Sequence, residues 1–298
     1  MADDLVFDRT SDGVYGSPVT LSPLVRRVLA HNPSPFTFTG TATHIVGHGT
    51  VAVIDPGPDD GAHVAAVVAA LAGETVAAIL VTHTHRDHTG AVPALAKATG
   101  APVIGCAPIA PERAGPRLDA GGDDAYRPDR VLADGETVSG PGWTLAAVAT
   151  PGHTSNHLAF ALAEETALFS GDHVMAWSTT VVAPPDGSMA AYRASLAKLL
   201  DRREERYYPA HGPARDEARA YVAALLRHRE AREAQILARL RAGDRSIPAI
   251  VAAAYPGLDP RLVTAAGLSV RAHLEDLAGR GLVVSRGGPG GEPAFAPA

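Results

Sequence analysis

The residues best suited to chemistry are concentrated in one short run, Thr82-His83-Thr84-His85-Arg86-Asp87-His88. Three isolated candidates follow it in order, namely His153 in TPGHT, Asp172 in FSGDH and His211 in YPAHG. Imidazole nitrogens and carboxylate oxygens are metal ligands, and without a thiolate among them they suit zinc but also iron or manganese. Seven metal-binding side chains in four segments are enough for two adjacent divalent ions.

The spacing inside this run allows one loop to face two metals. His83 and His85 are two positions apart, so in an extended segment their rings lie on the same side, while Asp87 and His88 follow where the chain turns into a helix. The apolar run AAILV at 77–81 predicts a buried strand before the loop, and residues 91–98 predict a helix after it. A zincin would instead require H-E-x-x-H on a helix, which the sequence lacks.

Two cations held roughly 3.5 to 4 Å apart lower the pKa of a shared water and stabilise the negative charge that develops during attack. The pattern therefore predicts hydrolysis by a metal-bridging hydroxide at a carbonyl or phosphorus centre, with no serine or cysteine nucleophile. Asp87 and Asp172 are catalytic candidates because their charge makes two nearby cations tolerable. His157, close behind His153, is a third candidate, either as a residue that supports a metal ligand or as a donor to the leaving group.

These segments resemble the metallo-β-lactamase superfamily of hydrolases over roughly residues 30–285. The resemblance implies that the first metal is held by His83, His85 and His153, and the second by Asp87, His88 and His211, with Asp172 as the bridge. It also implies that Asp55 in DPG orients the loop by hydrogen bonds. The zinc β-lactamases of the superfamily mostly use a cysteine where this chain has Asp172, so antibiotic hydrolysis is not implied. Zinc is the expected metal, and iron and manganese stay open.

Within the superfamily, the chain is similar to the β-lactamase-like protein 2 group, whose mitochondrial member is a single-strand endoribonuclease. The segments FSGDHVM, STTVVAPPDGSM, YRASLAKLL and YPAHGP carry this similarity. Our primary interpretation is a dinuclear metal hydrolase acting on an ester, a thioester or a related small acyl substrate. Cleavage of single-stranded RNA is the alternative. A non-catalytic binding protein on the same fold is a third hypothesis, against which the complete ligand set argues.

The elements that must position these side chains alternate between helix and strand. Two strands around a glycine turn are expected at 36–55, a helix at 60–72, a strand at 102–105, a hairpin around Asp134-Gly135, two further strands up to residue 170, and helices at 189–201 and 214–242. This rhythm predicts an α/β fold, a layered αββα sandwich. The resemblance implies the same four-layer fold.

The tail from residue 243 predicts a separate small domain. Ser246-Ile247-Pro248 begins a helix with a capping serine and an early proline. A turn in YPGLDP, a long helical segment and two short strands then follow the winged-helix plan. The predicted domains are a catalytic domain at 1–215, a connecting helix at 216–242 and a winged-helix-like domain at 243–298.

Composition sets broader limits. The chain has 298 residues, of which 46% are hydrophobic, so it can bury a sizeable core. The N-terminus MADDLVFDRT is acidic where a signal peptide is basic, Cys106 is the single cysteine, and no apolar stretch could span a membrane, so we expect a cytoplasmic protein without membrane contact. Residues 219–298 carry 11 Arg and seven acids, which gives no clean basic stripe for RNA. Its oligomeric state is not predicted.

Overall fold

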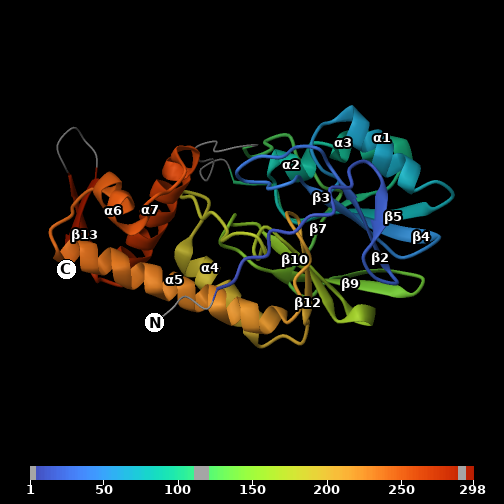
Figure 1. Ribbon diagram of the computed structural model, residues 1–298. Helices are drawn as coiled ribbons and strands as arrows, with labels where there is room; N and C mark the ends of the chain where they lie inside the picture. Colours follow the sequence, from blue (N-terminus) through green and yellow to red (C-terminus); the bar gives the residue numbers. More distant parts are fainter. Residues whose placement is uncertain (1–4, 111–120, 288–292) are drawn as a thin grey trace.

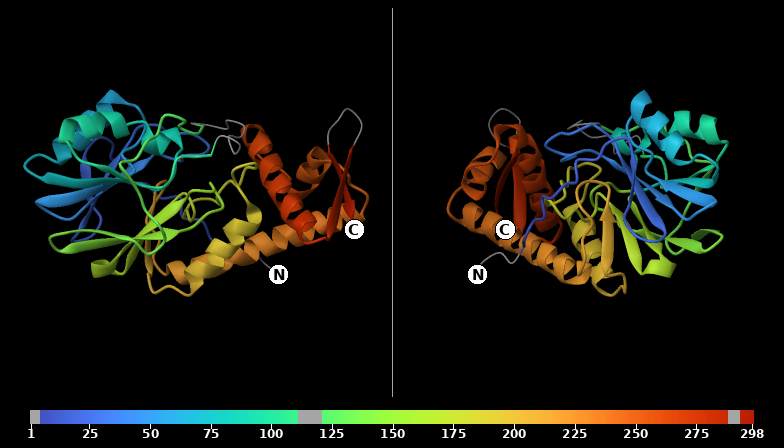
Figure 2. Two further views of the ribbon diagram at one scale, coloured as in Figure 1. Left: turned by 180° about the vertical axis from the view of Figure 1, so that it is seen from behind. Right: turned by 45° about the vertical axis from the view of Figure 1, so that its right-hand side comes forward.

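Two β-sheets lie face to face between two layers of helices (Figure 1). The computed structural model describes residues 5–110, 121–287 and 293–298. Helices α1 (Gly61–Ala70) and α3 (Val92–Thr99) cover the outer face of the first sheet, and α4 (Met189–Leu200) and α5 (Ala218–Arg241) cover that of the second (Figures 1 and 2). The predicted four-layer αββα sandwich is therefore confirmed.

The first sheet contains seven strands in sequence order, antiparallel from β1 to β4 and parallel from β4 to β7. Its strands are β1 (Pro18–Thr20), β2 (Val25–Leu29), β3 (Ala42–Val46), β4 (Thr50–Ile54), β5 (Thr75–Val81), β6 (Val103–Gly105) and β7 (Arg130–Val131). The second sheet has the order β12-β11-β10-β9-β8. Its strands are β8 (Thr137–Gly140), β9 (Trp143–Ala149), β10 (Leu158–Leu162), β11 (Ala167–Gly171) and β12 (Arg206–Pro209).

Successive side chains of β10, a central strand of the second sheet, point alternately into two hydrophobic cores. In β10, Leu158, Phe160 and Leu162 pack into the core shared with the first sheet, whereas Ala159 and Ala161 face the core under α4 and α5. Side chains two positions apart share a face, so one strand serves both layers. This explains why β10 is apolar along its whole length, as is usual for a strand covered on both faces.

Two predicted strand assignments were wrong. Residues 36–41 do not extend β3, because Phe38 and Gly40 have φ values of +56° and +136° and turn the chain. The turn at Asp134-Gly135 is not a hairpin either, because β7 before it pairs with β6 in the first sheet and β8 after it pairs with β9 in the second. Local turn chemistry was recognised correctly, but it does not determine which sheet the next strand joins.

The C-terminal part forms two helices followed by a two-stranded wing (Figure 2). Its elements are α6 (Ile247–Ala254), α7 (Val263–Gly279), β13 (Val283–Gly287) and β14 (Pro293–Pro297). Ser246 caps α6 as predicted, since its hydroxyl accepts a hydrogen bond from Ala249 N. The long helix α5 packs against α4 and also against α6 and β14, so it joins the sandwich to the winged helix. Among the described residues, no helix combines the length and apolarity needed to cross a bilayer.

Trp143 connects the two sheets at one edge. Its ring is 1% exposed, and its Nε1 donates a hydrogen bond to Thr50 O of β4, at 2.8 Å. A Cβ atom at Gly47 would lie 2.4 Å from the Trp143 ring, and one at Gly140 would lie 2.5 Å from it. Both positions therefore need glycine to make room for the indole.

We expect Trp143→Ala to lower the free energy of unfolding by about 3–5 kcal/mol, because it leaves a large cavity and removes the hydrogen bond to Thr50 O. Urea denaturation of the metal-free protein measures this change. Val131→Ala is the control, since Val131 is 46% exposed and its loss should cost no more than about 0.5 kcal/mol. Equal losses in both variants would contradict the assigned role of Trp143.

Candidate metal centre

All predicted ligands lie where strands of the two sheets end. The run from His83 to His88 begins two residues after the end of β5 and continues into the short helix α2 (Arg86–Thr89). His153 lies in the turn between β9 and β10, Asp172 directly follows β11, and His211 comes two residues after β12. The fold thus gathers four distant segments at one edge of the sandwich.

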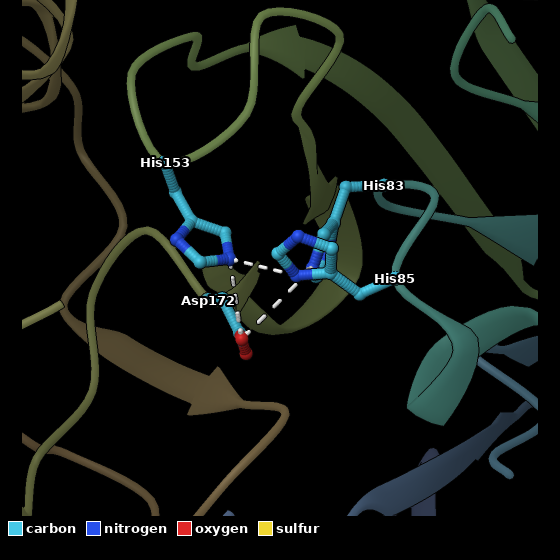
Figure 3. A group of neighbouring side chains, drawn as sticks. All are labelled: His83, His85, His153 and Asp172. Atoms are coloured by element: carbon cyan, nitrogen blue, oxygen red, sulfur yellow. Dashed lines mark hydrogen bonds and ion pairs between the residues drawn. The ribbon is translucent and has the colours of Figure 1, made fainter. Parts of the chain in front are cut away.

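Three imidazoles and one carboxylate point toward a common centre (Figure 3). His85 Nδ1 lies 3.0 Å from His83 Nε2 and 3.1 Å from His153 Nε2. Asp172 Oδ2 lies 3.6 Å from His153 Nε2 and 3.9 Å from His83 Nε2. Ligand atoms at about 2.0–2.2 Å from a tetrahedral zinc are ~3.3–3.6 Å apart, so the four atoms lie within a few tenths of an ångström of the spacing that one ion needs.

A second group of ligand atoms adjoins the first. Asp87 Oδ2 lies 3.2 Å from His211 Nε2 and 3.4 Å from His88 Nε2. Asp172 reaches this group as well, because its Oδ1 lies 3.3 Å from His211 Nε2 and its Oδ2 lies 3.7 Å from His88 Nε2. The Asp172 carboxylate therefore lies between the two groups, as a bridging ligand would.

Two of the candidate ligand atoms are left without a hydrogen-bond partner by the described protein groups. Asp172 Oδ1 and His88 Nε2 are buried and have no hydrogen-bond partner among the described residues. Such orphaned atoms are costly in a protein interior unless a ligand satisfies them. Both metal-binding groups consist of imidazole nitrogen and carboxylate oxygen, which are suitable donors for zinc and for other divalent transition metals.

Asp55 holds the loop by three hydrogen bonds, as the resemblance implied. Its Oδ1 accepts from Thr82 N, and its Oδ2 accepts from Thr82 Oγ1, each at 2.8 Å. Oδ2 also lies 2.9 Å from His88 Nδ1, and the Thr82 hydroxyl lies 3.0 Å from His83 Nδ1. One carboxylate thus fixes the ring orientation of a candidate ligand in each group.

Backbone carbonyls fix two further ligands. His153 Nδ1 lies 2.7 Å from Val181 O, and His211 Nδ1 lies 3.2 Å from Gly40 O. Each ring must therefore carry its proton on Nδ1 to donate this bond, which leaves Nε2 free to face the centre.

For Asp172 and His211, neighbouring charges outweigh the effect of burial on the pKa. Burial raises the pKa of the Asp172 carboxyl, but His211 and His88 hold that pKa well below its usual range. Burial lowers the pKa of His211, but Asp172 and Asp87 raise it to about 10. Burial also keeps the pKa of His85 low, at about 3, with the help of neighbouring His153. Without metal, the second group therefore holds protons and His85 does not.

His157 lies beneath the site instead of facing the cavity, so the geometry does not support it as a donor to a leaving group. It is 1% exposed, and both ring nitrogens are used: Nδ1 lies 2.9 Å from Thr150 Oγ1, and Nε2 accepts a hydrogen bond from Asp172 N at 3.1 Å. A Cβ atom at Gly171 would lie 2.6 Å from His157 Nε2, so the glycine allows this approach. His157 positions the Asp172 backbone.

The site opens into a cavity of about 480 Å³. Five candidate ligands line it, namely His85, Asp87, His153, Asp172 and His211. Its other walls include Phe36 and Trp177 of the sandwich, Arg229 and Arg232 of α5, and Leu262 and Ala266 of the C-terminal domain. Trp177 stacks on Phe38 at a ring distance of 5.0 Å and also forms part of the cavity wall.

Sequence reasoning missed the contribution of α5 to this cavity. Arginines at helix positions carry no local mark of a binding site. Cys106 is a buried thiol, and burial raises its pKa, so it is not suited to act as a nucleophile.

Comparison with known proteins gives matches to both parts of the chain. Residues 36–211 match the family model of the Metallo-beta-lactamase superfamily, and residues 246–291 match that of the Beta-lactamase associated winged helix domain. The Beta-lactamase-like protein 2 homolog of Caenorhabditis elegans is 34% identical over 223 residues, which are 73% of this chain and 71% of that protein. An Atrochrysone carboxyl ACP thioesterase of Aspergillus fumigatus is 34% identical over 227 residues, which are 74% of this chain and 66% of that protein.

Solved structures agree on the fold. A beta-lactamase domain protein from Burkholderia ambifaria matches with a TM-score of 0.80 at 22% identity, covering 97% of this chain and 96% of its own. A metallo-beta-lactamase family protein from Thermus thermophilus matches with a TM-score of 0.74 at 23% identity, covering 94% of this chain and 100% of its own. Both alignments extend through the C-terminal domain.

We expect Asp55→Asn to weaken metal binding about 10- to 100-fold, because the neutral amide orients Thr82 and His88 less well. Asparagine tolerates the left-handed backbone of Asp55, whose φ is +49°, so the fold should persist. Competition with a chromophoric chelator measures the affinity. Asp60→Asn is the matched control, because Asp60 only caps α1 and asparagine caps equally well. Unchanged affinity in Asp55→Asn would refute the orienting role.

Metal binding should release protons. The pKa values of His88 and His211 are raised by neighbouring acids, so both rings are protonated in the metal-free protein at neutral pH. A metal needs their lone pairs, so filling both groups at about pH 7.5 should release about two protons from these rings, in addition to the proton that a metal-bound water loses. Because the pKa of His211 is about 10, the share from this ring should vanish as the pH rises through that value. Calorimetry in buffers of different ionisation enthalpy counts these protons, and a release near zero at neutral pH would contradict the assignment.

Proposed function

Because the chain belongs to the metallo-beta-lactamase superfamily and is a metal-dependent hydrolase, we propose that it cleaves acyl thioesters with two divalent ions at this site. The observation that carries the proposal is the position of Asp172, between two groups of ligand atoms and at the wall of the cavity. His83, His85 and His153 would hold one ion, and Asp87, His88 and His211 the other, with Asp172 shared. Zinc is the metal that we propose, because the donors are imidazole and carboxylate.

When bound, such ions lower the pKa of water into the neutral range and stabilise the negative charge that develops on the attacked carbonyl oxygen. The protein's own residues supply the surroundings for this chemistry. Asp87 and Asp172 offset the positive charge, and both lie in a site where burial strengthens electrostatic interactions. His157 and Thr180 fix the Asp172 backbone, because Thr180 Oγ1 donates to Asp172 O at 2.7 Å.

An acyl substrate is supported by the walls of the cavity and by the relatives. The cavity wall includes apolar side chains, among them Phe36, Met175 and Leu262, beside the polar groups of the metal site, and apolar walls with convergent polar groups are typical of small-molecule pockets. One relative at 34% identity is named as a thioesterase acting on an acyl carrier protein. A thioester joins an apolar acyl chain to a good leaving group, so it suits such a cavity.

RNA cleavage, the alternative from the sequence, finds no support in the C-terminal domain. Arg261 pairs with Asp259 at 2.7 Å, and Arg271 pairs with Glu275 at 2.8 Å. Arg280 pairs with both Glu233 and Asp276. Arginines neutralised in this way do not form the basic surface that phosphate contacts need. The hypothesis of a non-catalytic protein fails because the ligand set is assembled as well as complete.

A substrate panel tests the proposal directly. Zinc-loaded protein is given an octanoyl thioester of N-acetylcysteamine, a p-nitrophenyl ester, a phosphodiester and single-stranded RNA. We expect the thioester to have the highest kcat/KM. Cleavage of RNA while the thioester survives would overturn the proposal.

Asp172→Ala should lower kcat/KM by about 1,000-fold or more, which corresponds to roughly 4 kcal/mol in the barrier. Elemental analysis should show that it also lowers the metal content from about two ions per chain, because both groups lose a ligand. Asp216→Ala is the control, since Asp216 pairs with Arg206 on the surface. Full metal content and activity in Asp172→Ala would refute the two-metal site.

A further inference from the structure

Arg229 of α5 is a buried guanidinium in the wall of the cavity. The residue is only 3% exposed, and it lines the cavity together with the candidate metal ligands. Its Nε has no hydrogen-bond partner, and no carboxylate pairs with it in the parts of the chain that the structure describes. An unpaired buried charge is costly, so an anion bound at this arginine would stabilise it.

Two carboxylates on the helices around Arg229 are already used by other arginines. Arg193, which also lies near the buried His273 of α7, pairs with Glu233 at 2.9 Å and with Asp276 at 3.2 Å. Arg280 shares the same two carboxylates. The fold therefore neutralises Arg193 and Arg280 with carboxylates, whereas Arg229, in the cavity wall, has no such partner among the described residues.

The guanidinium of Arg229 is held in a fixed orientation. It lies over the Tyr192 ring at 5.1 Å from the centroid, and its Nη2 donates a hydrogen bond to Thr180 O at 2.5 Å. Cation–π contact stabilises the charge without neutralising it. Such a held guanidinium is prepared to bind an anion, because little side-chain freedom would be lost.

Arg229 borders the segment that supports the metal ligands. Thr180, whose carbonyl it binds, donates its hydroxyl to Asp172 O, and the next residue, Val181, accepts from His153 Nδ1. The same cavity continues past Arg229 to Leu262 and Ala266 of the C-terminal domain. An anion at Arg229 would thus belong to a molecule that reaches from the metal centre toward the winged helix.

We propose that Arg229 binds an anionic group of the substrate, a carboxylate or a phosphate, at a distance from the bond that is cleaved. This inference rests on the proposed function, since it assigns a second contact to the same substrate. The planar guanidinium fork matches the oxygens of both groups. Arg232, which lines the same cavity from α5, is less available, because it lies over the Tyr255 ring and donates to Gln235 and to the carbonyl of Ala254.

The anion has two chemical sources, and four thioesters distinguish them. A carboxylate on the acyl chain is tested with octanedioyl and octanoyl thioesters of neutral N-acetylcysteamine. A phosphate on the thiol is tested with octanoyl thioesters of phosphopantetheine and pantetheine. In one of these pairs, we expect Arg229→Met to raise KM for the anionic member about 10- to 100-fold and to change the neutral member by no more than about threefold.

Two further variants show whether Arg229 acts through its charge at the cavity. Arg229→Lys keeps the charge but loses the fork, so its KM for the anionic substrate should be intermediate. Arg193→Met is the matched control, because it removes a nearby positive charge outside the cavity wall and should leave the preference for the anionic member unchanged. If Arg229→Met changes all four substrates by the same factor, or if the wild-type protein prefers neither anion, the proposal is overturned.

A binding measurement separates this proposal from the thioesterase assignment. Calorimetry with the zinc-loaded protein compares the mono(methylamide) of octanedioic acid with its bis(methylamide), and phosphopantetheine with pantetheine. We expect one anionic ligand to bind at least about tenfold more tightly than its neutral counterpart, and Arg229→Met to abolish that difference. If no thioester is cleaved but this difference is found, the proposed reaction fails and the anion site stands. If the difference survives in Arg229→Met, the anion binds elsewhere and the proposal fails.

Discussion

The structure depends on keeping one carboxylate, Asp172, charged in a buried position. A lone buried carboxylate would become protonated, because burial disfavours its charged form. Here His211 and His88 lie 3.3 and 3.7 Å from its oxygens and hold its pKa well below the usual range. The neighbouring imidazoles therefore do two things, because they stabilise the anion in the metal-free protein and supply the nitrogens that metals need.

This requirement explains why the fold brings four strand ends together. The ligands are spread over more than a hundred residues, and the parallel pairing of β11 with β12 brings Asp172 and His211 to the same edge as the loop after β5 and the turn between β9 and β10. Close approach there needs unusual backbone. Asp55 has a φ of +49° and Gly171 one of +51°, and both lie directly against the site. Such conformations persist where the surrounding contacts hold them, as the hydrogen bonds of Asp55 do.

The metal ligands could be predicted from the sequence more completely than the residues around them. The run at 83–88 and the residues His153, Asp172 and His211 were identified from side-chain type and spacing, and the family and the winged helix were confirmed by the comparisons. The sequence left two roles open for His157 because it lies directly before β10 while His153 lies in the preceding turn, and four positions of separation do not determine which way each ring points. Arg229 carried no signal at all, since a helix rich in arginine is usually solvated. Only tertiary packing shows that it is buried.

The two parts of the chain contribute different residues to the site and its cavity. Each candidate ligand comes from the sandwich, so the reaction is determined there, and its demands on geometry leave little room for variation. The far walls of the cavity come from α5, α7 and the segment between α6 and α7, where side chains are free of metal geometry. A change at Leu262 or Ala266 can therefore reshape the space for a substrate without moving a ligand. On the proposed function, the cavity wall can thus differ for different acyl groups while the metal site is kept.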